Sequence, residues 1–231
     1  FKNIDCVFHL AAESRIQTAI KNPVKTFKVN FMGTLNILEA SRVYRVNKVL
    51  YSSTSSYYGI KNSPPLVEDM DRDCLNPYSS SKVAGEDLVK IYSKLYGINS
   101  IIFRYFNVYG ERQPTKGQYA PVVGLFQKMK SEGKAMTVVG DGLSRRDYTH
   151  VADVVNANIL ALTKKEIQNS ITINIGTGVN YSILELVDLI EGEYVYISPR
   201  EGEAKETLAD ISAAKKYLNW EPTICLKDWI K

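Results

Sequence analysis

The stretch that decides the fold runs from residue 48 to residue 104 and begins with Lys48-Val49-Leu50-Tyr51-Ser52-Ser53. A long amphipathic pattern follows from Pro77 to about Tyr96, and a second apolar run comes after it, Ser100-Ile101-Ile102-Phe103-Arg104. Pro77 falls in the first turn of the predicted helix, where its missing N–H costs nothing. Strand, helix and strand in this order predict a βαβ unit, and therefore a parallel sheet buried on both faces.

The same alternation extends toward the amino terminus. Asp5–Leu10 is a predicted strand, and a second amphipathic helix is predicted from Pro23 to about Arg45. Because the chain enters the first strand almost directly from Phe1, we expect it to begin in mid-domain. A complete dinucleotide-binding fold carries a glycine-rich turn near its start, but residues 11–18 contain no glycine. That turn is therefore absent or lies upstream of Phe1.

Beyond Asn107 the alternation loosens. We expect a loop rich in Gly, Pro and Gln from Gly110 to Pro121, a helix near Val122–Lys130, and short strands at Thr137–Val139 and Thr172–Ile175. This pattern predicts a smaller lobe packed on the sheet. The expected division is 1–106 for the sheet domain and 107–231 for the lobe, with residues 150–177 or so returning to the sheet.

Composition narrows the classes of partner. Basic residues outnumber acidic ones by only 29 to 25, and no long basic run is present, so we expect neither nucleic acid nor a membrane surface as a partner. Three distant cysteines and two histidines give no metal-site spacing and favour a reducing, cytoplasmic setting. No apolar run approaches the roughly 18 residues of a membrane span. Small molecules are the expected partners.

The strongest chemical signal is Tyr78-Ser79-Ser80-Ser81-Lys82 at the start of the second predicted helix. Four residues make about one turn, so the tyrosine and the lysine lie on one face. At about 4 Å and an effective dielectric of about 20, the ammonium favours the phenolate by about 4 kcal/mol, or roughly three pKa units. We therefore expect the Tyr78 pKa near neutrality, where a general base works best.

Tyr-x-x-x-Lys also occurs on helices by chance, and its context strengthens the functional interpretation. The polar stretch from Ser52 to Ser56 follows a predicted strand, and His9-Leu10-Ala11-Ala12 follows another. Parallel sheets bind ligands at the carboxyl ends of their strands. The combination predicts one site at that edge, although a polar turn would explain residues 52–56 alone.

Together these segments resemble the Ser/Thr and Tyr-x-x-x-Lys active site of the extended short-chain dehydrogenase/reductase family. The resemblance covers essentially the whole chain and is closest to the NAD-dependent nucleotide-sugar epimerases and dehydratases. Further segments match the family in order, namely Val29–Thr34, Arg104–Gly110, Gly140-Asp141-Gly142, Arg146-Asp147-Tyr148, Val151-Ala152-Asp153, Asn174–Gly178, Arg200-Glu201-Gly202-Glu203, Ala209-Asp210 and Leu218–Pro222. The implied fold is α/β, a Rossmann-type doubly wound parallel sheet with its amino-terminal strands missing and a smaller substrate-binding lobe.

The resemblance also implies a role for each matching residue. Thr54, Tyr78 and Lys82 would be catalytic. NAD would contact the two strand ends and their neighbours, namely Leu10, Ala11, Ala12, Asn30, Ser52, Tyr78, Lys82 and Tyr105. The UDP-sugar would contact Thr54, Asn107, Val122, Val123, Val139, Arg146, Arg200, Glu203 and Thr207. Arg146 and Arg200 would clamp the diphosphate, whose geometry guanidinium groups match.

Individually, several of these residues have simpler interpretations. Asn30 could hydrogen-bond backbone alone, and Asp153 fits the N-cap of a helix. Arg146 and Arg200 could be surface cations, and the three valines could be core residues.

The residues after Thr54 separate the members of this family. Dehydrating relatives typically carry an acidic pair there and decarboxylating relatives a glutamate, whereas this chain has Ser55 and Ser56. The resemblance therefore implies epimerisation of a UDP-hexose at C4 by removal and return of hydride. A dehydratase or decarboxylase and a non-catalytic NAD-binding protein are the alternatives. Relatives also pair two helices per subunit in a four-helix bundle, which implies a homodimer through 23–45 and 77–96.

Overall fold

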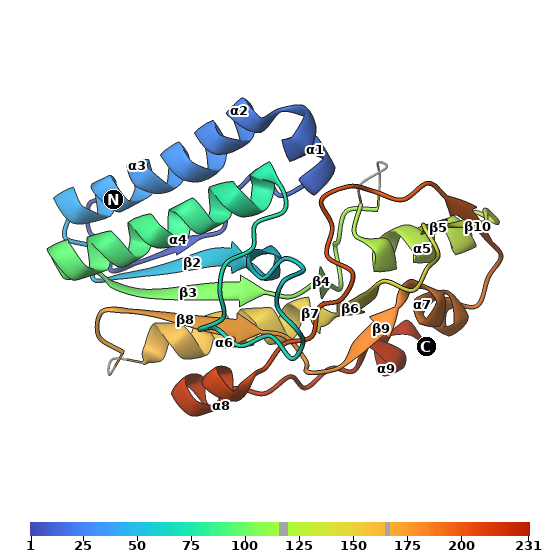
Figure 1. The fold of residues 1–231 in the computed structure, drawn as a ribbon. Helices are drawn as coiled ribbons and strands as arrows, with labels where there is room; N and C mark the ends of the chain where they lie inside the picture. The colour runs from blue at the N-terminus through green and yellow to red at the C-terminus, as the bar shows by residue number, and fades with distance from the viewer. Residues whose placement is uncertain (116–119, 165–166) are drawn as a thin grey trace.

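Four parallel strands form the central sheet in the order β1-β2-β3-β8 (Figure 1). They are β1 (Cys6–His9), β2 (Lys48–Thr54), β3 (Asn99–Tyr105) and β8 (Ser170–Ile175). The register sets His9 beside Tyr51, and Thr54 beside Tyr105. The carboxyl ends of all four strands therefore meet at one edge, which faces the rest of the molecule (Figure 1). The computed structural model describes residues 1–115, 120–164 and 167–231.

One face of the sheet is covered by a helical layer from both crossovers (Figure 1). Its elements are α1 (Ile16–Lys21), α2 (Pro23–Phe27), a π-helical turn (Lys28–Met32), α3 (Gly33–Val43) and α4 (Pro77–Tyr96). Leu38 and Val89 from these helices pack with Val49, Tyr51 and Ile102 of the sheet. Burial of these apolar side chains holds the layer in place.

The opposite face is covered by α6 (Val151–Thr163) and α8 (Ser212–Leu218) (Figure 1). Ala157 and Ala161 let α6 approach Leu50, Phe103 and Ile173 closely. Trp220, 1% exposed, packs in the same cluster, and its indole donates to the Asp153 carbonyl at 3.0 Å. The sheet is thus buried on both faces, and the predicted α/β fold class is confirmed.

A smaller lobe lies beyond the carboxyl edge of the sheet (Figure 1). It contains α5 (Val122–Ser131), α7 (Ile183–Ile190) and α9 (Leu226–Ile230) around Tyr109, Phe126 and Leu186. Its short strands are β4 (Val108–Tyr109), β5 (Met136–Val139), β6 (Arg145–Asp147), β7 (Thr149–His150), β9 (Asn180–Ser182) and β10 (Tyr194–Ile197). The strands pair two by two, as β4-β7, β5-β10 and β6-β9.

The predicted elements agree with the structure where local signals are strong. The helix from Pro77 ends at Tyr96, where Gly97 adopts φ 70° and closes it. The other long helix begins at Pro23 as predicted, but it contains the π-helical turn and ends at Val43. The short helix α1 is not predicted, and residues 116–119 of the predicted loop lie outside the described residues. No helix within the described ranges is long and apolar enough to cross a membrane.

Candidate active site

The first turn of α4 is fixed by a reciprocal cap. The Asn76 side-chain oxygen accepts from the Ser79 amide at 2.9 Å, and the Ser79 hydroxyl approaches the Asn76 amide at 3.3 Å. The Asn76 side-chain amide also donates to the Gly202 carbonyl at 2.7 Å. One residue thus starts the helix that carries Tyr78 and Lys82 and ties it to the lobe.

Tyr78 faces Thr54 across the carboxyl edge of the sheet. A side-chain hydrogen bond joins the two residues, and Thr54, at the end of β2, is 6% exposed. The Thr54 hydroxyl oxygen also accepts from the Ser56 amide at 3.1 Å, which fixes its position. The spacing-based expectation of a threonine and a tyrosine meeting at one strand end agrees with this arrangement.

The electrostatics of this pair differ from the prediction. Burial raises the pKa of Tyr78 above its ordinary value, and the hydrogen bond from Thr54 only partly opposes that change. The expected Tyr78 pKa near neutrality is therefore wrong for this structure. The reason is the position of the lysine, because the Lys82 ammonium lies 4.2 Å from the centroid of the Tyr51 ring.

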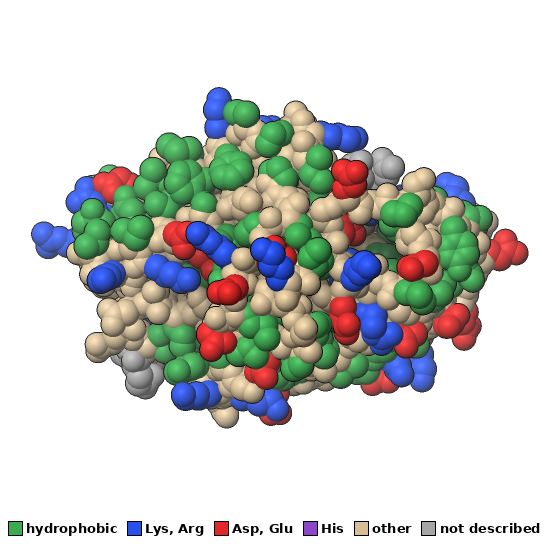
Figure 2. Space-filling view, in the orientation of Figure 1, with side chains coloured by type: hydrophobic (Ala, Val, Ile, Leu, Met, Phe, Trp, Pro, Cys, Tyr) green, Lys and Arg blue, Asp and Glu red, His purple; other side chains and the backbone are tan. Residues whose placement is uncertain are grey.

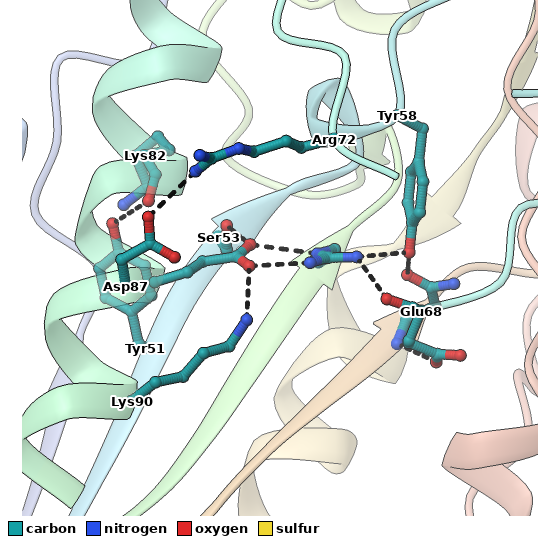
Figure 3. Close-up of polar contacts among 11 residues, drawn as sticks. Tyr51, Ser53, Tyr58, Glu68, Arg72, Lys82, Asp87 and Lys90 are labelled. Carbon is teal, nitrogen blue, oxygen red and sulfur yellow. Dashed lines mark hydrogen bonds and ion pairs between the residues drawn. The ribbon is translucent and has the colours of Figure 1, made fainter. Parts of the chain in front are cut away.

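Lys82 is a buried cation held by aromatic and backbone contacts. Its side chain is 2% exposed, and burial lowers its pKa to about 8 despite the opposing effect of the Glu86 carboxylate. The Tyr51 hydroxyl donates to the Lys82 carbonyl at 3.0 Å (Figure 3). Among the described residues no acceptor takes a hydrogen bond from the ammonium, so its three donors are available to a ligand.

A buried ion pair lies behind the catalytic turn. Arg104 of β3 donates from Nη2 to Glu86 of α4 at 2.8 Å, and Glu86 also meets the Ser53 hydroxyl (Figure 3). Arg104 Nη1 donates to the Tyr58 hydroxyl at 3.1 Å and to the Glu68 carbonyl at 3.0 Å. This network was not predicted from the sequence. A charged residue inside an apolar strand was the available signal, because it requires a buried partner.

Asn30 holds the segment that follows β1. Its side-chain oxygen accepts from the Glu13 amide at 2.7 Å, and its nitrogen donates to the Glu13 carbonyl at 3.0 Å and to the Ser81 hydroxyl at 2.9 Å. Asn30 is 0% exposed, so its amide is fully used within the protein. It therefore supports the site rather than facing the cleft.

A cleft of about 600 Å³ opens between the carboxyl edge and the lobe. Its lining includes all the residues proposed to bind the sugar nucleotide, together with two further predicted residues. They are Thr54, Tyr78, Tyr105, Asn107, Val122, Val123, Val139, Arg146, Arg200, Glu203 and Thr207. Segments as far apart in the sequence as Thr54 and Thr207 therefore meet in one cavity. The predicted residues outside this lining are Leu10, Ala11, Ala12, Asn30, Ser52 and Lys82.

The residues expected at the cofactor side lie along β1 and β2. Leu10 is 61% exposed at the end of β1, and Ala11 and Ala12 follow it. The Ser52 hydroxyl hydrogen-bonds the Tyr105 phenol, whose oxygen also accepts from Asn158 at 2.9 Å. Within the described ranges no group of three His, Cys, Asp or Glu side chains could hold a metal ion.

Backbone carbonyls orient Arg146 in the cleft. Its Nη1 donates to the carbonyls of Arg145 at 2.9 Å and Lys205 at 3.1 Å, and its Nη2 lies 3.7 Å from the Glu203 carboxylate. The neighbouring Asp147, 0% exposed, accepts from the amides of Thr177, Gly178 and Ala209 at 2.8 to 3.1 Å. Asp147 thus fastens the strand of Arg146 to the turn after β8, a role that sequence reasoning did not assign.

Asp153 does not cap α6 as expected. His150 is the cap, and its Nδ1 accepts from the Ala152 amide at 3.2 Å. Asp153 lies in the first turn of the helix, and its carboxylate accepts from the Thr223 hydroxyl at 2.7 Å and from the Ile224 amide at 3.1 Å. These hydrogen bonds anchor the segment of Thr223 and Ile224 on α6.

Known proteins resemble the chain over essentially its whole length. A family model described as GDP-mannose 4,6 dehydratase matches residues 2–231. A putative UDP-glucose 4-epimerase of Methanocaldococcus jannaschii is 41% identical over the whole chain and 76% of its own length. A UDP-glucuronate 4-epimerase of Thermodesulfobacterium geofontis is 36% identical over 99% of the chain and 71% of its own length.

Solved structures give the same result. UDP-glucose 4-epimerase of Thermotoga maritima, solved with UDP-glucose, superposes with a TM-score of 0.93 at 35% identity, over 98% of this chain and 75% of that one. UDP-glucuronic acid 4-epimerase of Bacillus cereus, solved with UDP-glucuronic acid and NAD, gives 0.90 at 34% identity, over 99% and 73%. The chain belongs to the NAD-dependent nucleotide-sugar epimerases of the extended short-chain dehydrogenase/reductase family.

Proposed function

We propose that the protein interconverts two UDP-hexoses that differ at C4, through a transient 4-keto sugar. The observation that carries this proposal is the position of the Tyr78 phenol, which is hydrogen-bonded to Thr54 and lies one turn before the buried Lys82. All of these groups stand at the carboxyl edge of a parallel sheet, where such sheets bind ligands.

The chain fits the nicotinamide and ribose half of NAD. Lys82 offers three hydrogen-bond donors that no described residue accepts, which suits a pair of ribose hydroxyls. Tyr105 is fixed by Ser52 and Asn158 beside the same strand ends. NAD, when bound, supplies a reversible acceptor for the hydride at C4. The segment that follows β1 does not supply a glycine-rich turn for the diphosphate of NAD, because residues 11–18 lack glycine.

In this proposal Tyr78 takes the proton of the sugar 4-hydroxyl and later returns it. Because burial raises the pKa of the Tyr78 phenol, it would first have to release its own proton to solvent, once substrate and cofactor are bound, before it can accept the proton of the sugar. A nearby positive charge favours the phenolate, and a cationic nicotinamide ring would provide one when NAD is bound. Thr54 would hold the oxygen on C4 by a hydrogen bond while the proton moves.

The acid-base inventory of the cleft favours epimerisation over dehydration. Among the described residues that line it, Glu203 is the single carboxylate, and it lies 3.7 Å from Arg146. Next to Thr54 the chain has Ser55 and Ser56, which cannot serve as a carboxyl acid or base. Loss of water or carbon dioxide from the sugar therefore lacks a dedicated group, whereas hydride removal and return needs only Tyr78.

For the nucleotide, Arg146 and Arg200 of the cleft lining are proposed to bind the diphosphate, and Val122, Val123 and Val139 to pack on the base. The relatives themselves differ in their sugars, since their names include UDP-glucose and UDP-glucuronate. The names of the relatives therefore do not decide whether the sugar of this protein is a neutral or an acidic hexose.

We also propose a homodimer that pairs α3 and α4 of two subunits. Hydrophobic side chains gather over these helices on the visible face (Figure 2). Ile91 is 49% exposed, Leu95 65% and Val43 59%. Association would remove this apolar surface from water. The three free cysteines, Cys6, Cys74 and Cys225, suit the reducing cytoplasm.

The test uses protein expressed from the complete reading frame, incubated with NAD and UDP-hexoses. Proton NMR of the sugar ring should show conversion to the C4 epimer and an equilibrium reached from either side. A 4-keto-6-deoxy sugar would assign the protein to the dehydratases, and release of carbon dioxide to the decarboxylases. Either result would overturn the proposal.

A further inference from the structure

Arg15 is a charged residue of the cleft that the proposed function does not use. It lies between β1 and α1, is half-buried, and lines the cavity together with Ser14 and Gln17. Within the described ranges no hydrogen bond, ion pair or ring contact involves its side chain. A partly desolvated guanidinium without a partner is unfavourable, so it is suited to bind an anion.

The backbone that carries Arg15 is fixed to the catalytic turn of α4. Asn30 binds both the amide and the carbonyl of Glu13, at 2.7 and 3.0 Å. The same Asn30 donates to Ser81, whose hydroxyl donates to the Tyr78 carbonyl at 2.8 Å. On the other side, Gln17 donates to the Glu201 carbonyl at 3.0 Å. Arg15 is therefore held at the Tyr78 end of the cleft.

The chemistry of a pyranose indicates which anion this position reaches. C1, which carries the diphosphate, and C4, which must face Tyr78, lie at opposite ends of the ring. The C6 substituent is attached at C5, next to C4. A cation held near Tyr78 therefore meets the C6 group, and the diphosphate extends away from it toward Arg146.

The charged residues of the cleft are consistent with separate sites for the C6 group and for the diphosphate. The charged residues of the described lining are Arg15, Arg146, Arg200 and Glu203. Arg146 is oriented by two backbone carbonyls of the lobe, those of Arg145 and Lys205. Building on the proposed function, we propose that Arg15 binds a carboxylate at C6, so that the preferred substrate is a UDP-hexuronate.

The experiment compares UDP-glucuronate and UDP-glucose as substrates of wild type, Arg15→Gln and Arg15→Lys, made from the complete reading frame. We expect wild type to favour the uronate. Arg15→Gln should lower the ratio of the two kcat/KM values by tenfold or more, equivalent to about 1.4 kcal/mol, mainly by raising the KM for the uronate. Arg15→Lys keeps the charge but loses the bidentate fork of the guanidinium. Its ratio of kcat/KM values should therefore lie between those of wild type and Arg15→Gln.

Lys25→Gln in α2 is the matched control, because Lys25 is exposed and does not line the cleft, so the change removes one positive charge outside the site. Binding of UDP alone, measured by calorimetry, separates the two possible anions. Weaker UDP binding with equal losses on both sugars would place Arg15 on the diphosphate and overturn the uronate proposal. An unchanged ratio in Arg15→Gln, or a wild type that favours the neutral sugar, would overturn it too. A wild type that epimerises neither sugar contradicts the proposed function itself.

Discussion

Arg104 and Glu86 form an ion pair of 2.8 Å in which each side chain is 1% exposed. Arg104 also stacks over the Tyr57 ring, with its guanidinium carbon 3.3 Å from the centroid. The pair joins β3 to α4 one turn after Lys82, and Glu86 is also the carboxylate that opposes the lowering of the Lys82 pKa. A single buried contact thus couples the sheet, the catalytic helix and the charge on its lysine.

Removing one partner of this pair should be strongly destabilising. Glu86→Gln leaves the buried guanidinium without its counter-charge, and such changes cost about 3–5 kcal/mol. Arg104→Met together with Glu86→Leu should recover part of that loss, because no unpaired charge remains. Urea denaturation gives the free energy of unfolding of each variant. As a control, Glu221→Gln breaks the exposed pair with Lys215 and should cost less than about 1 kcal/mol. Similar losses of unfolding free energy in Glu86→Gln and Glu221→Gln would contradict the prediction.

Stability should fall with acid because of His9. The ring is 5% exposed, contacts the Thr34 hydroxyl at 2.9 Å and lies 5.6 Å from the Tyr51 ring. Burial, and then the charge of Lys82, lower its pKa to about 4. Between about pH 6.5 and 4 the unfolded chain therefore binds a proton that the folded protein does not, so stability falls as the pH falls, by up to about 3 kcal/mol.

The variant His9→Gln isolates this contribution. Glutamine can place an amide nitrogen near Thr34 but does not titrate. The unfolding free energies of wild type and variant, measured from pH 7 to 4.5, should converge as the pH falls. Protonation of carboxylates changes the stability of both proteins equally, so it does not contribute to the difference. Parallel curves would show that His9 is not the group responsible.

Tyr78→Phe tests the proton transfer directly. The change removes the phenol oxygen and little volume, so the fold and the binding of NAD should persist. Turnover should fall by 10²–10⁴-fold or more, as is typical for loss of a general acid-base group. Fluorescence of bound NADH reports cofactor binding, and NMR reports epimerisation. Near wild-type turnover in the variant would exclude Tyr78 as the proton acceptor.

Much of the fold followed from local sequence signals. Pro77 at the start and Gly97 at the end bound α4 at the predicted residues, because both act through their own backbone conformations. The π-helical turn at Lys28–Met32 could not be predicted in this way. It contains Asn30, whose side chain binds Glu13 and Ser81, and these contacts exist only once three separate segments have packed.

The site was predictable as a set of residues but not as an electrostatic arrangement. The spacing of Tyr78 and Lys82 predicted that they lie on one helix face. The order of the motifs predicted that Arg146 and Arg200 line the same cleft, as they do in the structure. The position of the Lys82 ammonium over Tyr51 depends on burial that no local pattern reports. Glu86 and Arg104, 18 residues apart, likewise meet only in the folded sheet.

Thr207 is expected to decide whether the cleft admits an N-acetyl group at C2 of the sugar. It lines the cleft, is 6% exposed, and its backbone N–H donates a hydrogen bond to the Arg145 carbonyl at 3.1 Å. The resemblance to related epimerases implies that a bulky tyrosine at this position would restrict the substrate to plain hexoses. A threonine leaves room, so wild type should accept UDP-N-acetylglucosamine as well as UDP-glucose. Thr207→Tyr should lower the ratio of kcat/KM for the acetylated sugar to that for the plain sugar by tenfold or more, about 1.4 kcal/mol, through steric exclusion.

Thr207→Ser, which keeps the hydroxyl near the Asp147 amide and removes one methyl group, should leave the ratio near that of wild type. Kinetics on both sugars with all three proteins decide the question, because equal losses on the two sugars in Thr207→Tyr would mean that residue 207 does not border the C2 pocket.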